Sequence, residues 1–240
     1  MKNLKRSAHP PGLEILQMEV GEMENFVYLI ACTATGEAAV VDPAWEVPAI
    51  LEQARAAGWR ITHALLTHHH HDHINGVAAL VEATDATVIM QQDELPMLAH
   101  AGLPMAGEQL PNLRAARPGE DITIGRLSLR CVHTPGHTPG SQCFLVQDSL
   151  LAGDTLFINA CGRCDFRGSD PEAMYRSLTS VLGQLPDGTV LYPGHNYAAM
   201  PDSTMGAEKR NNPYYPVPDL ERFVELRRGK FIEFIADYGV

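Results

Sequence analysis

The sequence has no apolar run close to the roughly 20 residues that a membrane-spanning helix needs. Its first 12 residues include Lys2, Lys5 and Arg6, but no apolar segment follows them, so they do not form a secretory signal. We expect residues 1–12 to be a flexible lead and residues 13–240 to form a single domain with a short C-terminal helical tail. These absences predict a cytoplasmic protein that does not contact a membrane.

Basic residues are also scarce. The chain has 18 Lys and Arg residues against 29 Asp and Glu residues, which gives a formal net charge of -11. Sequence-independent nucleic-acid binding needs a basic surface, so we expect no nucleic-acid partner. The five cysteines are an odd number and are not spaced as a disulfide framework, which favours a reducing compartment. The oligomeric state cannot be read from the sequence.

The patterns of apolar residues predict an α/β layered fold in one domain. Strands are predicted at residues 13–20, 26–32, 38–41, 61–66, 86–90, 122–124, 127–132, 143–146, 150–151 and 190–192. Helices are predicted at residues 47–57, 75–83, 93–99, 171–184 and 220–228. Residues 102–118 carry several Gly and Pro residues and are predicted to be a loop that could overhang a site. This order favours two mixed β-sheets with helices outside them.

The most informative stretch is residues 67–73, which holds five of the chain's 11 histidines. This stretch contains the pattern His68-x-His70-x-Asp72-His73, directly after a predicted buried strand. Neutral imidazole and carboxylate groups are ligands that zinc prefers. In an extended segment His68 and His70 would point to one side, and Asp72 and His73 would follow at a turn and could face a second metal. A purification tag would stand at a terminus and would lack the embedded aspartate, so we predict a metal site.

Three further candidate ligands stand at turns that directly follow predicted strands. They are His137, Asp154 and His195, and each comes after a glycine, which lets the backbone approach a cluster of ligands closely. An isolated histidine or aspartate in this position is usually a turn residue. Together with the first motif, however, the three provide enough ligands for a dinuclear site.

With these motifs the sequence resembles the metallo-β-lactamase superfamily, in its glyoxalase II-like branch. The resemblance runs from about the first strand to about Pro213. It implies the αββα sandwich of that superfamily, an α/β fold with two mixed β-sheets and helices on the outer faces. It also implies the role of each ligand: the first metal would be held by His68, His70 and His137, the second by Asp72, His73 and His195, and Asp154 would bridge them.

Such a site would carry out hydrolysis without a protein nucleophile, and the sequence has no Gly-x-Ser-x-Gly elbow. Two zinc ions about 3.5–4 Å apart can share a water and lower its pKa toward ~7. The resulting metal-bound hydroxide would attack a carbonyl, and the metals would stabilise the developing oxyanion. Asp72 would orient the hydroxide as well as bind metal. We expect two zinc ions; one iron, or a mixture of zinc, iron and manganese, is the alternative because these ligands accept all three.

The resemblance indicates two substrates. Residues 153–157, followed by Cys161-Gly162-Arg163, resemble glyoxalase II, which hydrolyses S-acylglutathione thioesters. The whole segment 161–166, Cys-Gly-Arg-Cys-Asp-Phe, also resembles the persulfide dioxygenases of the same branch, which use one iron to oxidise glutathione persulfide. The main hypothesis is therefore a thioesterase of glyoxalase II type, and the alternative is a mononuclear iron persulfide dioxygenase. A β-lactamase, a nuclease or a non-enzymatic metal-binding module fits these features less well.

The sequence departs from glyoxalase II at its C-terminal end. That family appends a helical domain that supplies glutathione contacts, whereas about 27 residues follow Pro213 here. The thioester could therefore be a small molecule linked to glutathione, to coenzyme A or to a carrier protein. Candidates for binding an anionic substrate arm are Arg163, Tyr197, Lys209 and Arg210, although a surface charge or a packed tyrosine explains each of them equally well.

Cys161-x-x-Cys164 is the one cysteine pair with a spacing typical of redox or zinc sites. A structural zinc site would need a second pair, which the sequence lacks. We therefore interpret the segment as a family loop in which Cys164 is incidental.

Overall fold

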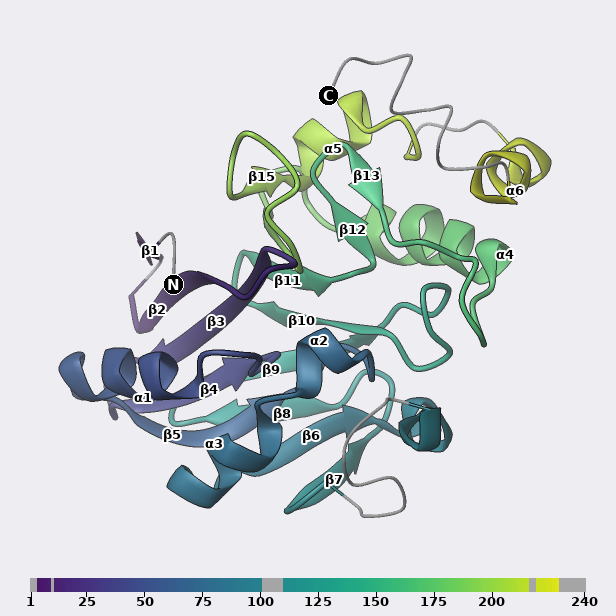
Figure 1. The fold of residues 1–240 in the computed structure, drawn as a ribbon. Helices are drawn as coiled ribbons and strands as arrows, with labels where there is room; N and C mark the ends of the chain where they lie inside the picture. Colours follow the sequence, from purple (N-terminus) through teal and green to yellow (C-terminus); the bar gives the residue numbers. More distant parts are fainter. Residues whose placement is uncertain (1–3, 10, 101–109, 216–218, 229–240) are drawn as a thin grey trace.

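The computed structural model describes residues 4–9, 11–100, 110–215 and 219–228. Two β-sheets face each other, and helices cover their outer sides, as Figure 1 shows. The strand order is β1-β2-β3-β4-β5-β6-β7 in the first sheet and β15-β14-β11-β10-β9-β8 in the second. The predicted α/β sandwich of two mixed sheets is confirmed.

The first sheet is antiparallel in its N-terminal half and parallel in the rest. Four strands pair antiparallel, namely β1 (Leu4–Ala8), β2 (Leu13–Val20), β3 (Asn25–Cys32) and β4 (Glu37–Val41). Three follow in parallel, namely β5 (Arg60–Leu65), β6 (Thr87–Gln91) and β7 (Leu113–Ala116). Every residue of β3 is buried, as expected for a continuous apolar run inside a sandwich.

Two segments that were predicted to be a flexible lead and a loop each contain a strand, and the short strands β12, β13 and β15 were not predicted either. Residues 4–8, part of the predicted flexible lead, form the edge strand β1, in which Lys5 bonds to Asp202 and Arg6 to Glu14. Residues 113–116, part of the predicted loop 102–118, form β7 beside β6. Both are short strands at the two edges of the sheet, and neither shows the alternation of apolar and polar residues that predicts a strand. Residues 102–109 of that loop lie outside the described residues.

The second sheet follows the first in the chain. Its main strands are β8 (Asp121–Ile124), β9 (Leu127–His133), β10 (Gln142–Val146), β11 (Ser149–Gly153), β14 (Val190–Pro193) and β15 (Ser203–Thr204). A small hairpin, β12 (Leu156–Phe157) and β13 (Ala160–Cys161), leaves the sheet after β11. The turn between β8 and β9 requires Gly125, because φ is +59° there and a Cβ would come within 2.1 Å of Thr35 Oγ1.

The helices are short and lie between the strands. On the side of the first sheet they are α1 (Val47–Ala56), α2 (His71–Ile74), α3 (Val77–Thr84) and the 3-10 segment η1 (Gln92–His100). On the side of the second sheet they are α4 (Pro171–Arg176), continued by η2 (Ser177–Val181) and η3 (Leu182–Gln184), then α5 (Met205–Asn211) and α6 (Leu220–Arg228). The predicted helix 171–184 is therefore one helical run that changes type. None of the helices in the described part of the chain has the length and apolar character that crossing a bilayer requires.

Three layers of buried apolar side chains hold these elements together. One layer includes Ile50 and Leu80 of α1 and α3 against the first sheet, a second fills the space between the sheets, and a third joins the second sheet to α4 and α6. Full burial of each Leu, Ile, Val or Phe stabilises the fold by roughly 1.5–3 kcal/mol. That residues 13–240 make a single domain stays a prediction.

Several strands of the two sheets end together at one edge of the sandwich. The strands β11 and β14 are parallel, so they end at the same edge. The two sheets are joined there by Gln142, whose Nε2 donates to Leu66 O at 2.9 Å and whose backbone N–H donates to Thr67 O at 2.9 Å. The loops that follow β5, β9, β11 and β14 therefore meet at this edge.

Candidate metal centre

The seven side chains that the sequence proposes as metal ligands all converge at this edge. Four stand in residues 68–73 after β5, and one each follows β9, β11 and β14. Their nitrogen and oxygen atoms form three groups, in each of which the atoms lie within 4.8 Å of one another: His68, His70 and His137; Asp72, His73 and His195; and His68, His73 and Asp154. The grouping matches the two ligand sets expected from the resemblance, with Asp154 near both.

The ring nitrogens face one another at hydrogen-bonding distances. His70 Nδ1 lies 3.0 Å from His68 Nε2 and 3.0 Å from His137 Nε2. His73 Nε2 lies 3.2 Å from His195 Nε2 and 3.4 Å from Asp154 Oδ1. Asp154 Oδ1 is buried and makes no hydrogen bond. Converging imidazole nitrogens and an unpartnered buried carboxylate oxygen are the donor set that zinc, iron or manganese takes, so the residues fit bound cations.

The electrostatics of the centre differ between its two sides. Burial lowers the pKa of His68 well below its ordinary value and lowers the pKa of His70 to about 3. Burial would also lower the pKa of His73, but the carboxylates of Asp154 and Asp72 raise it well above the ordinary value. The first side is thus held as neutral imidazole, which is the ligand form. On the second side the two carboxylates attract positive charge, which a cation would supply in place of a proton.

Contacts behind the ligands fix the orientation of each ring. The Nδ1 of His73 donates to Asp42 Oδ2 at 2.9 Å, that of His137 to the Arg163 carbonyl at 2.8 Å, and that of His195 to the Met23 carbonyl at 2.8 Å. An imidazole whose Nδ1 is engaged presents its Nε2 to the centre, as metal-binding histidines do. Asp42 is not among the ligands predicted from the sequence, although its place directly after the buried strand 38–41 was a usable signal.

A second carboxylate that the sequence analysis missed is Glu94, in η1. It is fully buried, and its Oε1 accepts hydrogen bonds from the backbone N–H and the Nδ1 of His69. Its Oε2 accepts from Thr138 Oγ1 and from the Gly140 N–H. Glu94 therefore ties the loop that carries His68 and His70 to the loop that carries His137. His69, which the motif leaves variable, is an anchor for that loop.

Asp72 is held by a chain of two polar side chains. Asn25 Nδ2 donates to Asp72 Oδ2 at 2.9 Å, and Trp45 Nε1 donates to Asn25 Oδ1 at 3.0 Å. Burial would raise the pKa of Asp72, but the neighbouring His73 and the hydrogen bond from Asn25 help to hold it well below its usual value. Asp72 is therefore an ionised carboxylate in a fixed orientation.

The structure brings two of the four candidate substrate-binding residues to the centre. Tyr197 stacks on the His195 ring, with the ring centres 4.7 Å apart. Arg163 follows Gly162 in the loop that contacts His137, and its guanidinium is paired with Asp165.

The other two candidates lie elsewhere. Lys209 and Arg210, in α5, are both paired with Asp187, which precedes β14, whereas His195 follows the opposite end of that strand. The structure therefore does not bring Lys209 and Arg210 to the metal ligands.

The cysteines of the Cys161-x-x-Cys164 segment are buried beside the centre. Burial raises the pKa of Cys164 to about 12 and also raises that of Cys161. Both are therefore neutral thiols at physiological pH. All five cysteines of the chain are free.

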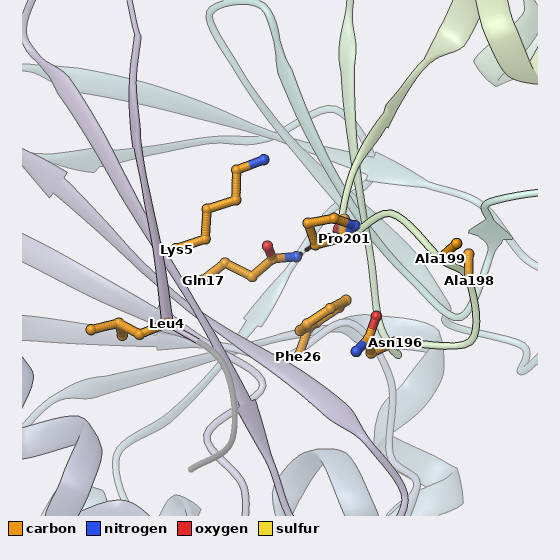
Figure 2. A pocket seen from close by; sticks show the side chains of 8 residues that line it. All are labelled: Leu4, Lys5, Gln17, Phe26, Asn196, Ala198, Ala199 and Pro201. Carbon is orange, nitrogen blue, oxygen red and sulfur yellow. Dashed lines mark hydrogen bonds between the residues drawn. The ribbon is translucent and has the colours of Figure 1, made fainter.

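A cavity of about 340 Å³ lies next to the segment that follows His195. As Figure 2 shows, it opens between the strands of the N-terminal half of the first sheet and residues 196–201. Its lining is formed by Leu4, Lys5, Gln17, Phe26, Asn196, Ala198, Ala199 and Pro201. Gln17 Nε2 donates to the Pro201 carbonyl at 2.8 Å across it. No candidate metal ligand lines this cavity, so it is separate from the centre.

Comparisons with known proteins agree with this geometry. Residues 20–195 match the model of the metallo-beta-lactamase superfamily. A probable polyketide biosynthesis zinc-dependent hydrolase, BaeB of Bacillus velezensis, is 32% identical over 206 residues, which cover 86% of this chain and 88% of that protein. A hydroxyacylglutathione hydrolase of Polaromonas sp. is 41% identical over 177 residues, which cover 72% of this chain and 62% of that protein. The crystal structure of ETHE1 from Myxococcus xanthus superposes with a TM-score of 0.79 and 33% identity over 89% of each chain.

Proposed function

This chain belongs to the metallo-β-lactamase superfamily, in its glyoxalase II-like branch, and on that premise we propose that it hydrolyses a thioester at the centre described above. The observation that supports the proposal is the convergence of seven imidazole and carboxylate side chains from four loops. His68, His70 and His137 would hold one cation, and Asp72, His73 and His195 would hold another. Asp154 would contact both. When bound, divalent cations supply Lewis acidity and lower the pKa of water.

The chain's own residues would orient the reaction. We propose Asp72 as the catalytic residue because Asn25 holds one of its oxygens, which leaves the other to accept a hydrogen bond from the attacking water. Asp42 and Glu94 would keep the ligand loops in place through their buried hydrogen bonds. Arg163 and Tyr197 are the proposed substrate contacts near the centre. Lys209 and Arg210 are not included because they pair with Asp187, at the end of β14 opposite to His195.

We propose two zinc ions as the cofactors. The zinc-dependent hydrolase of Bacillus velezensis supports zinc, and the two ligand sets support two cations. The match to hydroxyacylglutathione hydrolase supports a thioester but covers less than two thirds of that enzyme. The thiol carrier is therefore proposed only as glutathione, coenzyme A or a carrier protein.

A second candidate function is a mononuclear iron persulfide dioxygenase. It is favoured by the Cys-Gly-Arg-Cys-Asp-Phe segment and by the likeness to ETHE1 over nearly the whole chain. The metal content separates the two candidates because one expects two zinc ions and the other expects one iron.

The experiment begins with elemental analysis of protein purified without added metal. We expect close to two zinc ions per chain, hydrolysis of S-acyl thioesters, and no oxygen uptake with glutathione persulfide. A His70→Ala variant should lose metal and activity, whereas His63→Ala, in β5 and away from the ligands, should keep both. One iron per chain, together with oxygen uptake, would favour the persulfide dioxygenase and overturn the proposed thioesterase. No metal, with no recovery of either activity after metal addition, would overturn both.

A further inference from the structure

Three exposed aromatic side chains lie beside the candidate metal centre. Among the described residues, seven large apolar side chains are exposed: Leu4, Met23, Trp45, Phe166, Val181, Tyr197 and Met200. The three aromatic ones all contact histidines of the centre or its motif. Leaving large apolar groups in water is unfavourable, and a local concentration of them marks a surface that binds something apolar.

Phe166 covers the first side of the centre. Its ring centre lies 5.1 Å from that of His70 and 5.7 Å from that of His137, in edge-to-face geometry. The guanidinium of Arg163 lies 4.5 Å from the centre of the Phe166 ring. In spite of these contacts, 40% of Phe166 remains exposed. A group held at the first side would therefore lie against this ring.

Two other aromatic rings flank the second side. Trp45 is 39% exposed and packs at 6.0 Å against His71, while its indole N–H is engaged by Asn25. Tyr197 is 54% exposed and stacks on His195. The approach to the ligands is thus bordered by aromatic faces on both sides.

Charges near these rings do not favour an anionic acyl group. The guanidinium of Arg163 forms two hydrogen bonds with the carboxylate of Asp165, so its charge is already compensated. An uncharged hydrocarbon chain needs no cationic partner and would bury the exposed part of Phe166.

We infer that the substrate is a thioester with an apolar acyl chain, which lies on Phe166, while Trp45 and Tyr197 border the entrance. The inference rests on the proposed thioester hydrolysis and adds the chemical class of the acyl group. Glutathione and pantetheine arms are rich in carboxylates or amides, so contact with the phenyl ring of Phe166 would gain less for the thiol side than for an alkyl chain.

The test uses acyl thioesters of N-acetylcysteamine, a small uncharged thiol, with chains from acetyl to octanoyl. Full burial of a methylene corresponds to about a fourfold effect, so a half-open site should raise kcat/KM about twofold for each added methylene. We expect Phe166→Ala to lower the octanoyl-to-acetyl ratio of kcat/KM at least tenfold. Val181→Ala is the matched control, because Val181 is 38% exposed but lies in η2, and it should leave the ratio unchanged.

A binding measurement separates this inference from the proposed function. S-alkyl thioethers of the same thiol lack the carbonyl and cannot be hydrolysed, and calorimetry with the metal-loaded protein gives their Kd. We expect affinity to rise with chain length in the wild type and to lose that dependence in Phe166→Ala. If this holds but no thioester is hydrolysed, apolar recognition stands and the thioesterase falls.

Three results would overturn the inference. One is a kcat/KM that is flat or falls with acyl chain length in the wild type. Another is a loss of kcat/KM in Phe166→Ala that is equal for all acyl chain lengths, which would show that the ring does not recognise the chain. The third concerns thioesters that share one acyl group and differ in the thiol. If the effect of Phe166→Ala on kcat/KM changes with the thiol, the ring contacts the carrier arm and not the acyl chain.

Discussion

At the scale of single residues, Asp154 is a carboxylate that lies among three imidazole rings. It stands among His73, His137 and His195, and its buried Oδ1 has no hydrogen-bond partner. Burial would raise its pKa, but His195 and His73 hold that pKa well below the ordinary value. A carboxylate that stays ionised although it is largely shielded from water needs compensating positive charge.

We therefore expect Asp154→Asn to remove at least one metal ion per chain and to lower thioester kcat/KM by more than about a hundredfold. Loss of a residue behind a ligand already costs about 10–100-fold, and a ligand common to both sides should cost more. Elemental analysis and steady-state kinetics check this. Asp121→Asn, which alters an exposed pair with Arg130, is the control. Full metal content in Asp154→Asn would show that Asp154 is not a ligand.

A second residue-scale prediction concerns the thiols of Cys161 and Cys164. Burial raises the pKa of both, and only the thiolate reacts with alkylating reagents. We expect neither to react with iodoacetamide at pH 8 in the native protein and both to react in urea, as read by mass spectrometry. Rapid native alkylation with loss of activity would instead indicate an accessible thiolate and revive a redox role.

At the scale of elements, Glu94 shows how η1 supports the ligand loops. Each of its oxygens accepts two hydrogen bonds, one pair from His69 and the other from Thr138 and Gly140. In Glu94→Gln an NH₂ group replaces one of the two oxygens and cannot accept the two hydrogen bonds made there. At least one of the two loops therefore loses its anchor. Because buried charged hydrogen-bond networks are strong, we expect a loss of about 2–4 kcal/mol in the free energy of unfolding.

Urea unfolding measures that loss, and metal titration should show an affinity about 10–100-fold weaker. Glu82→Gln, at an exposed position of α3, provides the comparison. Unchanged metal affinity in a destabilised Glu94→Gln protein would mean that Glu94 supports the fold but does not position the ligands.

The helix α6 supports the centre from the other side through Arg227. Arg227 is buried, its Nη2 donates to the Gly162 carbonyl at 2.8 Å, and its guanidinium lies 4.9 Å from the centre of the Tyr214 ring. The backbone carbonyl of the next residue, Arg163, accepts the hydrogen bond from His137 Nδ1–H. We expect Arg227→Gln to cost about 1.5–3 kcal/mol of stability and to weaken metal binding.

Chemical denaturation and metal titration check this as well. Arg222→Gln, on the same helix but exposed, should change neither quantity. If Arg227→Gln lowers stability with metal affinity intact, α6 covers the second sheet without influencing His137.

Elements also show what the sequence could predict. The buried strands and the His-x-His-x-Asp-His motif could be recognised because their signals are local: apolar runs, and ligands two or fewer residues apart. The edge strand β1 could not, because its sequence Leu-Lys-Arg-Ser-Ala lacks an apolar alternation, although it pairs with the neighbouring β2. Glu94 and Phe166 had no local signal either, since their roles depend on loops that fold against them. The ligand roles themselves stay predictions.

At the scale of the whole molecule, the proposed ligands come from both sheets, so bound metal would tie the two halves together. A ligand at a hundred times its Kd stabilises a native state by about 2.7 kcal/mol, which for a chain of this size corresponds to roughly 5–10 °C in Tm. We expect EDTA to lower Tm by about that amount and zinc to restore it, measured by calorimetry. The Tm of His70→Ala should fall by less when EDTA is added. An EDTA-insensitive Tm would indicate that the apo and metal-loaded forms are equally stable.

The distribution of the ligands over the two sheets also has a consequence for biosynthesis. His68 and His195 are 127 residues apart (195 − 68), and at ~5–20 residues per second the ribosome needs roughly 6–25 s between them. During that interval the nascent chain carries His68, His70, Asp72 and His73 with an incomplete set of ligands from the second sheet, because His137, Asp154 and His195 are added one after another. Such an open set ranks cations by intrinsic affinity, which favours copper over zinc. The cation finally held would then depend on which metals the cell makes available while the second half is still being synthesised.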